Sequence, residues 1–411
     1  MKFSYNLSMN NLKPLASFKF KNFKIYWIGM NLSLIGSWMQ SIAQPWLALS
    51  ITNDAFLVSL VAVAQFLPPL FLTLISGALV DKFDTKKLLF ISQSGLMLVA
   101  VLFTIIMLFF EISYLMILML SFMNGFFLSI DAPTRQSFVY EIIDDNKFIP
   151  NAVALNSMSF NVARVLGPGL AGLVIASLGI EYCFLINSVS FAAIIVSLFF
   201  IKNRRILSKN RSKNMLYSIK DGLIYAKNNH IISSMLYLLL IMALFLPHYN
   251  VTISALAKFE LNGNEKTFGY LMSFLGIGSF LGALFIASFG KLNFKMIFAA
   301  PILASIFLIL TGFSSNFYIS GLFLLMTGFF FVVASSSINS TIQLKTKNEY
   351  RGRVMSIYSL FFQGSIPFGA IYSGALVDTF KPRCGILMCA LSAIICIILL
   401  IRFKKVLFWK V

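Results

Sequence analysis

The chain has 411 residues, of which 59% are hydrophobic and only 11% charged, and its mean hydropathy is +0.86. This composition excludes an ordinary soluble domain, in which about a quarter of the residues carry charge. The 33 lysines and arginines outnumber the 14 acids and give a formal net charge of +19, an excess found in nucleic-acid-binding proteins and in membrane proteins with basic loops.

Twelve apolar segments are long enough to cross the hydrocarbon core of a bilayer, which takes about 20 residues of helix. Backbone polar groups find no water partners there, so each segment must be helical. The predicted spans are 24–51, 55–80, 88–110, 113–133, 154–179, 182–201, 231–257, 268–289, 294–313, 317–339, 355–377 and 384–401. The sequence therefore predicts an all-α polytopic membrane protein with twelve transmembrane helices.

The basic residues lie almost entirely on one side of these spans. All but five of the 33 fall before span 1, after the even-numbered spans or in the tail. The exceptions are Lys258, Lys266, Lys381 and Arg383 on the opposite side, and Arg164 inside span 5. By the positive-inside rule both termini are predicted to be cytoplasmic in the cell membrane. Topology then explains the charge without a nucleic-acid partner, and anionic lipid headgroups are the expected contacts.

The sequence contains no pattern of a catalytic, cofactor or metal site. GxxxxGK[ST] and HExxH motifs are absent, and the four cysteines (Cys183, Cys384, Cys389 and Cys396) lack CxxC spacing and neighbouring histidines. We therefore expect neither enzyme activity nor ATP-driven transport, and the cysteines are expected to pack with apolar neighbours. The basic segment before span 1 precedes a span too long for a cleavable signal, so span 1 is expected to remain as an anchor.

The longest polar interruption divides the spans six and six. It predicts an N-terminal half (1–201), a cytoplasmic linker (202–230) and a C-terminal half (231–411). Three short matches recur at nearly the same separation: 123–127 with 326–330, 77–79 with 282–284, and Pro168 with Pro367. These matches favour two pseudo-symmetric six-helix halves arranged as parallel repeats, an architecture of transporters that bind substrate between the halves.

Amides inside the spans are candidates for the substrate pathway. Gln40 and Gln44 are four residues apart on span 1 and share one helix face. They either line the cavity or hydrogen-bond to neighbouring helices, and both interpretations stay open. Asn124 in span 4 and Asn187 in span 6 offer the same choice.

The loop after span 2 carries a candidate gate, formed by Gly77, Asp81, Lys82 and Lys86. An acid here can accept hydrogen bonds from the start of a neighbouring helix and favour its positive dipole end. The start of span 11, with Arg351 and Arg353, is the expected neighbour, and the contact would hold the cytoplasmic side shut. The alternative is an acid that only balances local lysines.

Span 5 has small residues at every fourth position, Ala163, Gly167 and Ala171, which let a neighbouring helix approach closely. Pro168 removes one backbone hydrogen bond and permits a kink. Gly172 belongs to the same small-residue region.

Titratable groups inside the spans are few. Arg164 costs on the order of 3 kcal/mol near a helix centre, so it is expected to face the bundle interior or a water cavity. We predict that Arg164 pairs with Asp131 of span 4 or contacts an anionic substrate, with purely structural pairing as the alternative. His248 in span 7 is a candidate proton carrier or a hydrogen-bonded structural residue. Asp131 is the best titratable candidate for proton coupling.

The loop after span 2 resembles the signature of the major facilitator superfamily, Gly-x-x-x-Asp-Arg/Lys-x-Gly-Arg-Arg/Lys. Gly77, Asp81, Lys82 and Lys86 fit, whereas Asp84 and Thr85 depart from it. The run from Gly167 and Pro168 to Gly172 resembles the span-5 motif of the superfamily's exporters and antiporters.

Three longer stretches narrow the resemblance to the enterobactin-exporter-like branch, which includes drug effluxers: 151–157, 163–168 and 184–191. The resemblance implies a secondary active transporter, driven by the proton gradient without another cofactor, that exports small amphipathic molecules by rocker-switch alternating access, usually as a monomer. A lysophospholipid or other metabolite transporter of the same fold is one alternative. A non-transporting membrane receptor or scaffold is another.

Overall fold

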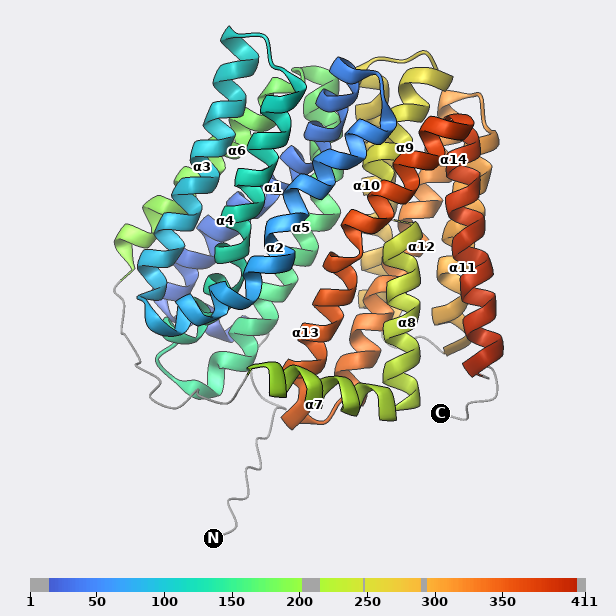
Figure 1. Cartoon of the computed structure of the whole chain (residues 1–411). Helices are drawn as coiled ribbons and strands as arrows, with labels where there is room; N and C mark the ends of the chain where they lie inside the picture. Colours follow the sequence, from blue (N-terminus) through green and yellow to red (C-terminus); the bar gives the residue numbers. More distant parts are fainter. Residues whose placement is uncertain (1–14, 202–214, 247, 290–293, 405–411) are drawn as a thin grey trace.

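The computed structural model describes residues 15–201, 215–246, 248–289 and 294–404, and they are almost entirely helical (Figure 1). The first half comprises the short helix η2 (Ala16–Lys19), α1 (Lys21–Thr52), α2 (Ala55–Lys82), α3 (Thr85–Phe109), α4 (Tyr114–Glu141), the short helix η3 (Asn146–Phe148), α5 (Ile149–Ser177) and α6 (Glu181–Phe200). The second comprises α7 (Met215–Asn228), α8 (His230–Phe245), α9 (Tyr249–Ala255), the π-helical turn η4 (Leu256–Glu260), α10 (Glu265–Phe289), α11 (Phe294–Phe313), α12 (Phe317–Lys345), α13 (Asn348–Gly364) and α14 (Ile366–Lys404).

Polar caps start several of these helices. A side-chain oxygen accepts a hydrogen bond from a backbone N–H of the first turn, and it thereby satisfies a group that has no partner within the helix. Residues in this role are Asp54, Asp84, Ser113, Asn229 and Asn316, before α2, α3, α4, α8 and α12 respectively.

The twelve predicted crossings are confirmed. Ten described stretches are long and apolar enough to cross a membrane, and one of them, Arg353–Phe403, contains the eleventh and twelfth crossings together. Helix α1 is long enough but too rich in Ser, Asn and Gln to be among the ten.

The ends of several helices differ from the prediction. Helix α4 continues to Glu141, beyond the predicted end at residue 133. The prediction placed Arg135 in a loop, but the residue lies inside α4, where its side chain is 14% exposed. The predicted seventh span is divided into α8, α9 and η4, and the eleventh changes from α13 to α14 at Ser365. The turn between the last two crossings is at Lys381, which has a left-handed φ of 69°.

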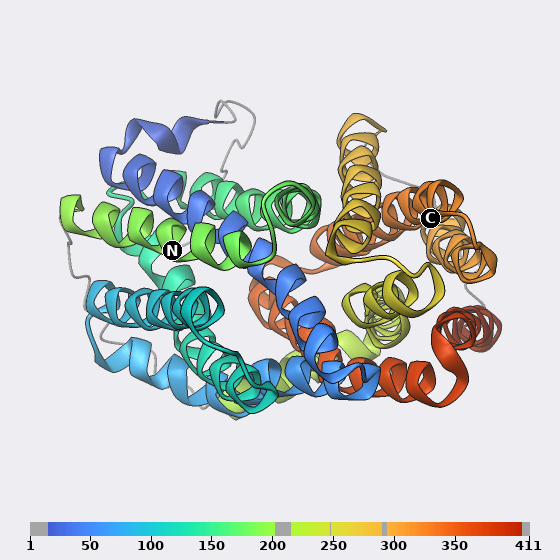
Figure 2. The ribbon, with the colours of Figure 1, turned by 90° about the horizontal axis from the view of Figure 1, so that it is seen from above.

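Helices α1–α6 lie on one side of the molecule and α8–α14 on the other (Figures 1 and 2). We name the end of the bundle where α1 begins and α14 ends the inner end, and the opposite end the outer end. The linker helix α7 lies across the inner end of the second half, against α8 and α13.

The two halves repeat one packing feature. A Cβ atom on Gly125 of α4 would lie 2.0 Å from the carbonyl oxygen of Gln65 in α2. A Cβ atom on Gly328 of α12 would lie 2.3 Å from the carbonyl oxygen of Leu275 in α10. Both glycines belong to the repeated sequence, so the repeat marks equivalent helix crossings in the two halves.

The halves meet through small residues of α5 and α10. A Cβ atom on Gly172 would lie 1.9 Å from the carbonyl oxygen of Gly269, and one on Gly276 would lie 2.7 Å from the backbone nitrogen of Gly169. The Ser273 hydroxyl donates a hydrogen bond to the Gly169 carbonyl at 3.2 Å. A close approach to span 5 is observed, but α10 makes it at Gly169 and Gly172, whereas Gly167 of the predicted face with Ala163 and Ala171 packs against α1.

A second contact between the halves joins α2 to α14 near the outer end. A Cβ atom on Gly374 would lie 2.7 Å from Cβ of Ser59. The rings of Trp46 in α1 and Phe268 in α10 stack at 5.0 Å in the same region. Contacts between the halves therefore gather towards the outer end in the part of the chain that the structure describes.

The Gly172→Ala substitution tests the crossing of α5 and α10, with Gly169→Ala as the matched control. Both changes favour the helix intrinsically by about 1 kcal/mol, but only Gly172→Ala places a Cβ against backbone, whereas nothing lies within 4 Å of the one at Gly169. Overpacking costs about 1–3 kcal/mol. We expect a lower melting temperature for Gly172→Ala and an equal or higher one for Gly169→Ala. Equal melting temperatures for both variants would contradict the crossing.

Candidate functional site

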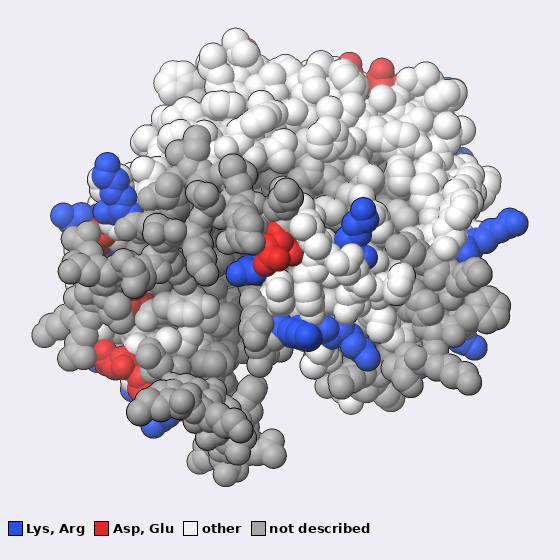
Figure 3. Space-filling view, turned by 60° about the horizontal axis from the view of Figure 1, so that its bottom comes forward, with Lys and Arg blue, Asp and Glu red and all other residues white. Residues whose placement is uncertain are grey.

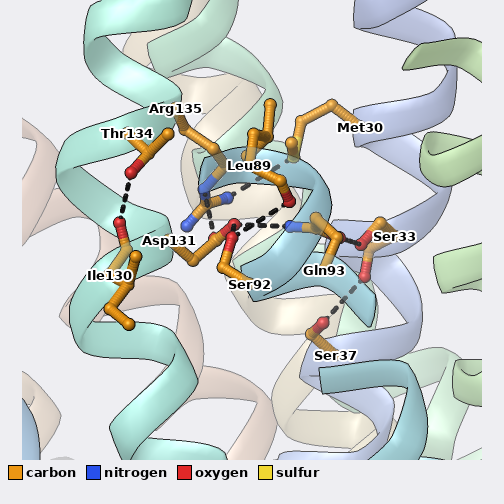
Figure 4. Close-up of polar contacts among 10 residues, drawn as sticks. All are labelled: Met30, Ser33, Ser37, Leu89, Ser92, Gln93, Ile130, Asp131, Thr134 and Arg135. Atoms are coloured by element: carbon orange, nitrogen blue, oxygen red, sulfur yellow. Dashed lines mark hydrogen bonds and ion pairs between the residues drawn. The ribbon is translucent and has the colours of Figure 1, made fainter. Parts of the chain in front are cut away.

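A buried carboxylate lies at the centre of a polar network in the first half (Figure 4). Asp131 of α4 is 1% exposed, and its Oδ2 pairs with Nε of Arg135 at 2.7 Å. Its Oδ1 accepts hydrogen bonds from Nε2 of Gln93 at 2.6 Å and from Oγ of Ser92 at 3.2 Å. A buried charge is tolerated when it has such partners, and here they come from α3 as well as α4.

The network continues to α1. Oγ of Ser33 donates to Oε1 of Gln93 at 3.2 Å, and the Ser37 hydroxyl donates to the Ser33 carbonyl at 2.8 Å. Nη1 of Arg135 lies 3.5 Å from the sulfur of Met30. The carboxylate is thus connected to three helices of the first half.

The predicted pair between Asp131 and Arg164 is wrong. Arg135 follows Asp131 by four residues, so the two share one face of α4 and pair within it. The prediction missed Arg135 because it ended span 4 at residue 133. The Arg164 guanidinium instead lies 5.7 Å from the ring centroid of Phe362 in α13, a cation–π distance. This contact joins the middle of α5 to the opposite half.

The amides of span 1 join helices within the first half. Gln40 is 3% exposed and accepts a hydrogen bond from Nδ2 of Asn187 in α6 at 2.6 Å. Gln44 is 1% exposed and donates to the Ser121 hydroxyl of α4. Of the two interpretations that the sequence left open, hydrogen bonding between helices fits these three candidates in this structure.

Asn124 and His248 are also buried. Oδ1 of Asn124 accepts a hydrogen bond from Nε2 of Gln65 at 3.3 Å, which joins α4 to α2. Nε2 of His248 lies 3.1 Å from the carbonyl oxygens of Ala243 and Leu244, at the end of α8 where carbonyls lack partners in the helix. These two short contacts fit the interpretation of His248 as a hydrogen-bonded structural residue.

The predicted gate is only partly within the described residues. The side chain of Asp81, that of Arg351 and the surroundings of Gly77 lie outside them. Lys82 is exposed, and Nζ of Lys86 donates to the Ile201 carbonyl at 2.8 Å. The predicted contact of Asp81 with the start of span 11 therefore stays a prediction.

Arg353, the other predicted gate residue, pairs with Asp221 of the linker helix α7. Their side chains are 36% and 33% exposed, so solvent screening limits this pair to below about 1 kcal/mol. The rings of Tyr225 in α7 and Tyr350 in α13 stack at 4.1 Å with 5° between their planes. Helix α7 is thus docked on the start of the eleventh crossing, which the sequence analysis did not predict.

The other span-5 residues take packing positions. A Cβ atom on Gly167 would lie 2.3 Å from Cβ of Trp38, so α5 packs closely against α1 there. Helix α5 continues without a break through Pro168, which is buried.

Polar side chains remain accessible on the inner half of α12 and on α13. Ser336, Asn339, Ser340 and Gln343 share one face of α12 and are half-buried or exposed. Gln363 of α13 is exposed and donates to the Ser359 hydroxyl at 2.8 Å. Sequence analysis missed this α12 face because it ended span 10 at residue 339, although the spacing of the polar residues would have indicated it.

Comparison with known proteins agrees with this architecture. Residues 12–408 match a family described as transmembrane secretion effector. The chain belongs to this family of major facilitator superfamily transporters.

Relatives of this chain are transporters by name. A staphyloferrin A transporter of Staphylococcus aureus is 26% identical over 87% of this chain and 90% of that protein. The multidrug efflux pump Tap of Mycolicibacterium fortuitum is 25% identical over 84% and 86% of the two chains. Macrolide efflux protein A of Streptococcus pyogenes is 22% identical over 88% and 91%.

Solved structures share the fold of this secretion effector. A bacterial homologue of the human lysosomal transporter Spinster superposes with a TM-score of 0.72 at 11% identity, over 95% of this chain and 98% of that one. The nucleoside transporter NupG gives 0.71 at 12% identity, over 95% and 100%. These similarities confirm the predicted major facilitator fold with its two six-helix halves.

A cysteine pair tests the docking of α7 on α13. A Cβ atom on Gly222 would lie 2.9 Å from Cβ of Arg353, slightly closer than the usual 3.5–4.5 Å of a disulfide. In a background with the native cysteines replaced, Gly222→Cys with Arg353→Cys should form a disulfide that mass spectrometry detects. The control pair, Leu223→Cys with Arg353→Cys, should not, because Leu223 is exposed. Equal crosslinking of both pairs would contradict the docked position.

Proposed function

We propose that this protein is a secondary active exporter of amphipathic small molecules, driven by the proton gradient and working by rocker-switch alternating access. The observation that carries the proposal is the accessible polar face on the inner half of α12 together with Gln363 of α13. Asn339 lies further inside α12 than Gln343, and Gln363 lies where α13 meets α14 within the eleventh crossing. Asn339 and Gln363 would be costly against hydrocarbon, so they are expected to face a water-filled passage between the halves.

The contacts between the halves support alternating access. In the described residues they concentrate near the outer end, at Gly172 and Gly269 and at Ser59 and Gly374. Nζ of Lys258 also donates to the Leu49 carbonyl across the halves at 2.8 Å. Rocking would open this outer contact while the inner end closes, and the proposed Asp81 gate would hold the closed inner end.

The cargo is inferred from the chemistry of the passage. Arg164 offers a cation at mid-membrane, and the faces of α12 and α13 offer neutral hydrogen-bonding groups. A separate apolar hollow of about 240 Å³ opens between α2, α8, α13 and α14, with Leu70, Leu244 and Phe368 among its walls and neither Arg164 nor α12 among its described lining. An amphipathic molecule with an anionic or hydroxylated part fits this combination. Siderophores and drugs, the cargo named for two relatives, are the first candidates, and lysophospholipids or other metabolites are the alternative.

Proton coupling is assigned to Asp131. It is the one buried acid among the described residues. Its hydrogen bonds link it to α3 and, through Gln93, to α1, so a change in its charge would alter the contacts between these helices. The proton gradient is the energy source and no other cofactor is proposed.

The proposed setting is the cell membrane, with both termini cytoplasmic and the protein acting as a monomer. Lys82, Lys87, Lys147 and Lys227 are exposed near helix ends at the inner end, which supports this orientation. Figure 3 shows lysines and arginines on the surface when this end is turned forward. Anionic headgroups of the inner leaflet are the expected partners for these lysines.

Reconstitution in liposomes tests the function. We expect an imposed pH gradient to drive movement of a siderophore or an amphipathic drug in the opposite direction to protons, and a deletion strain to become drug-sensitive or to secrete less siderophore. Transport that ignores the pH gradient would contradict proton coupling. Absence of transport for all of these cargo classes would favour a receptor or scaffold.

The Arg164→Ala variant tests the cargo assignment. Loss of the cation should reduce transport of an anionic substrate about tenfold, the equivalent of about 1.4 kcal/mol, and should affect a neutral one much less. Arg164→Lys is the control because it keeps the charge and should keep much of the rate. Equal losses for anionic and neutral cargo in liposomes would remove Arg164 from substrate recognition.

A further inference from the structure

The side-chain amide of Gln93 joins the buried carboxylate to α1. Gln93 lies in α3 and is 2% exposed. Its Nε2 donates to Oδ1 of Asp131 at 2.6 Å, and its Oε1 accepts from the Ser33 hydroxyl at 3.2 Å (Figure 4). Both the oxygen and the nitrogen of the amide are therefore hydrogen-bonded. In both bonds, from Ser33 to Gln93 and from Gln93 to Asp131, the donor points towards the carboxylate.

We propose that Gln93 is a positioning residue that fixes the Asp131 carboxylate and transmits its change of charge to α1 through Ser33. The inference rests on the proposed proton coupling. It adds a residue that carries no charge and that would itself neither bind nor release the proton.

The arrangement of partners selects the oxygen that takes the proton. Oδ2 faces the Arg135 cation, which disfavours protonation there, whereas Oδ1 faces the neutral groups of Gln93 and Ser92. A proton from water therefore forms an O–H bond at Oδ1, and the same bond breaks when the proton is released. No other covalent bond changes.

Protonation makes Oδ1 a donor, and it then faces the NH₂ donor of Gln93. In the proposed state the new O–H points at Gln93 rather than at the Ser92 hydroxyl, and the amide turns so that its oxygen accepts from the carboxylic acid, because two donors cannot share one hydrogen bond. Its NH₂ group then faces Ser33, whose hydroxyl must change from donor to acceptor. Both hydrogen bonds, from Ser33 to Gln93 and from Gln93 to Asp131, therefore reverse their direction. The change of charge at Asp131 thereby alters the hydrogen bonding of Ser33 in α1.

Other groups around the carboxylate are accounted for. Arg135 of α4 is its ion-pair partner, and Ser92 of α3 is a neutral donor. Tyr26 of α1 is buried and lies in the electrostatic field of Asp131 and Arg135. None of these side chains bonds to both Asp131 and Ser33, so Gln93 alone of the described residues makes the connection.

The pH profile of transport in liposomes tests the proposal. In Gln93→Leu the negative carboxylate loses a donor, so its proton should bind at higher pH, and the midpoint of the profile should move up by about one pH unit. Ser33→Ala should move it less in the same direction. Thr134→Val is the matched control, because this buried hydroxyl one turn along α4 bonds only to its own helix at Ile130. Its midpoint should equal that of the wild type.

A double-mutant cycle on the melting temperature keeps the test independent of transport. Gln93→Leu and Asp131→Asn should be clearly non-additive, because Asp131→Asn already removes the charge that Gln93 holds. Additive losses, or a Gln93→Leu midpoint equal to that of Thr134→Val, would overturn the proposal. A flat wild-type pH profile with a non-additive cycle would remove proton coupling and keep Gln93 as the residue that positions Asp131.

Discussion

The close approach of α5 and α10 is the contact on which the architecture depends. Lipid is as apolar as the helix surfaces, so burial of apolar groups gives little reason for the halves to associate. Glycines at 172 and 269 let the two backbones touch, which gives many weak dispersion contacts in a small area. When the halves separate, these contacts break but no buried charge loses its partner. An interface of this kind can therefore open and close.

Charge is distributed differently within and between the halves. The ion pair of Asp131 and Arg135 is enclosed in the first half with its hydrogen-bond partners, so separation of the halves would leave it intact. Arg164 lies where the halves meet, over a ring of the opposite half. A buried carboxylate with one ion-pair partner and two hydrogen-bond donors suits energy coupling, and a cation at the interface suits contact with cargo. The proposed mechanism assigns the two roles accordingly.

The sequence predicted the twelve crossings and a close helix approach at span 5, because apolar length and small-residue spacing are local properties, but it did not indicate that α10 packs at Gly169 and Gly172 while Gly167 faces α1. It placed Arg135 in the loop after span 4 because the apolar run ends at residue 133, whereas the helix continues to Glu141. That error led to the wrong pair of Asp131 with Arg164. Pairings between distant segments, such as Asp221 with Arg353 or Gln93 with Ser33, depend on helix arrangement and rotation, which no local pattern specifies.

The outer contact of α2 and α14 provides the most direct test of alternating access. Ser59→Cys and Gly374→Cys, in a background with the native cysteines replaced, place two thiols where Cβ atoms would be 2.7 Å apart, and slight separation permits a disulfide. If transport requires this contact to open, oxidation should stop transport in liposomes and a reducing agent should restore it. Full transport by the crosslinked protein would contradict the account.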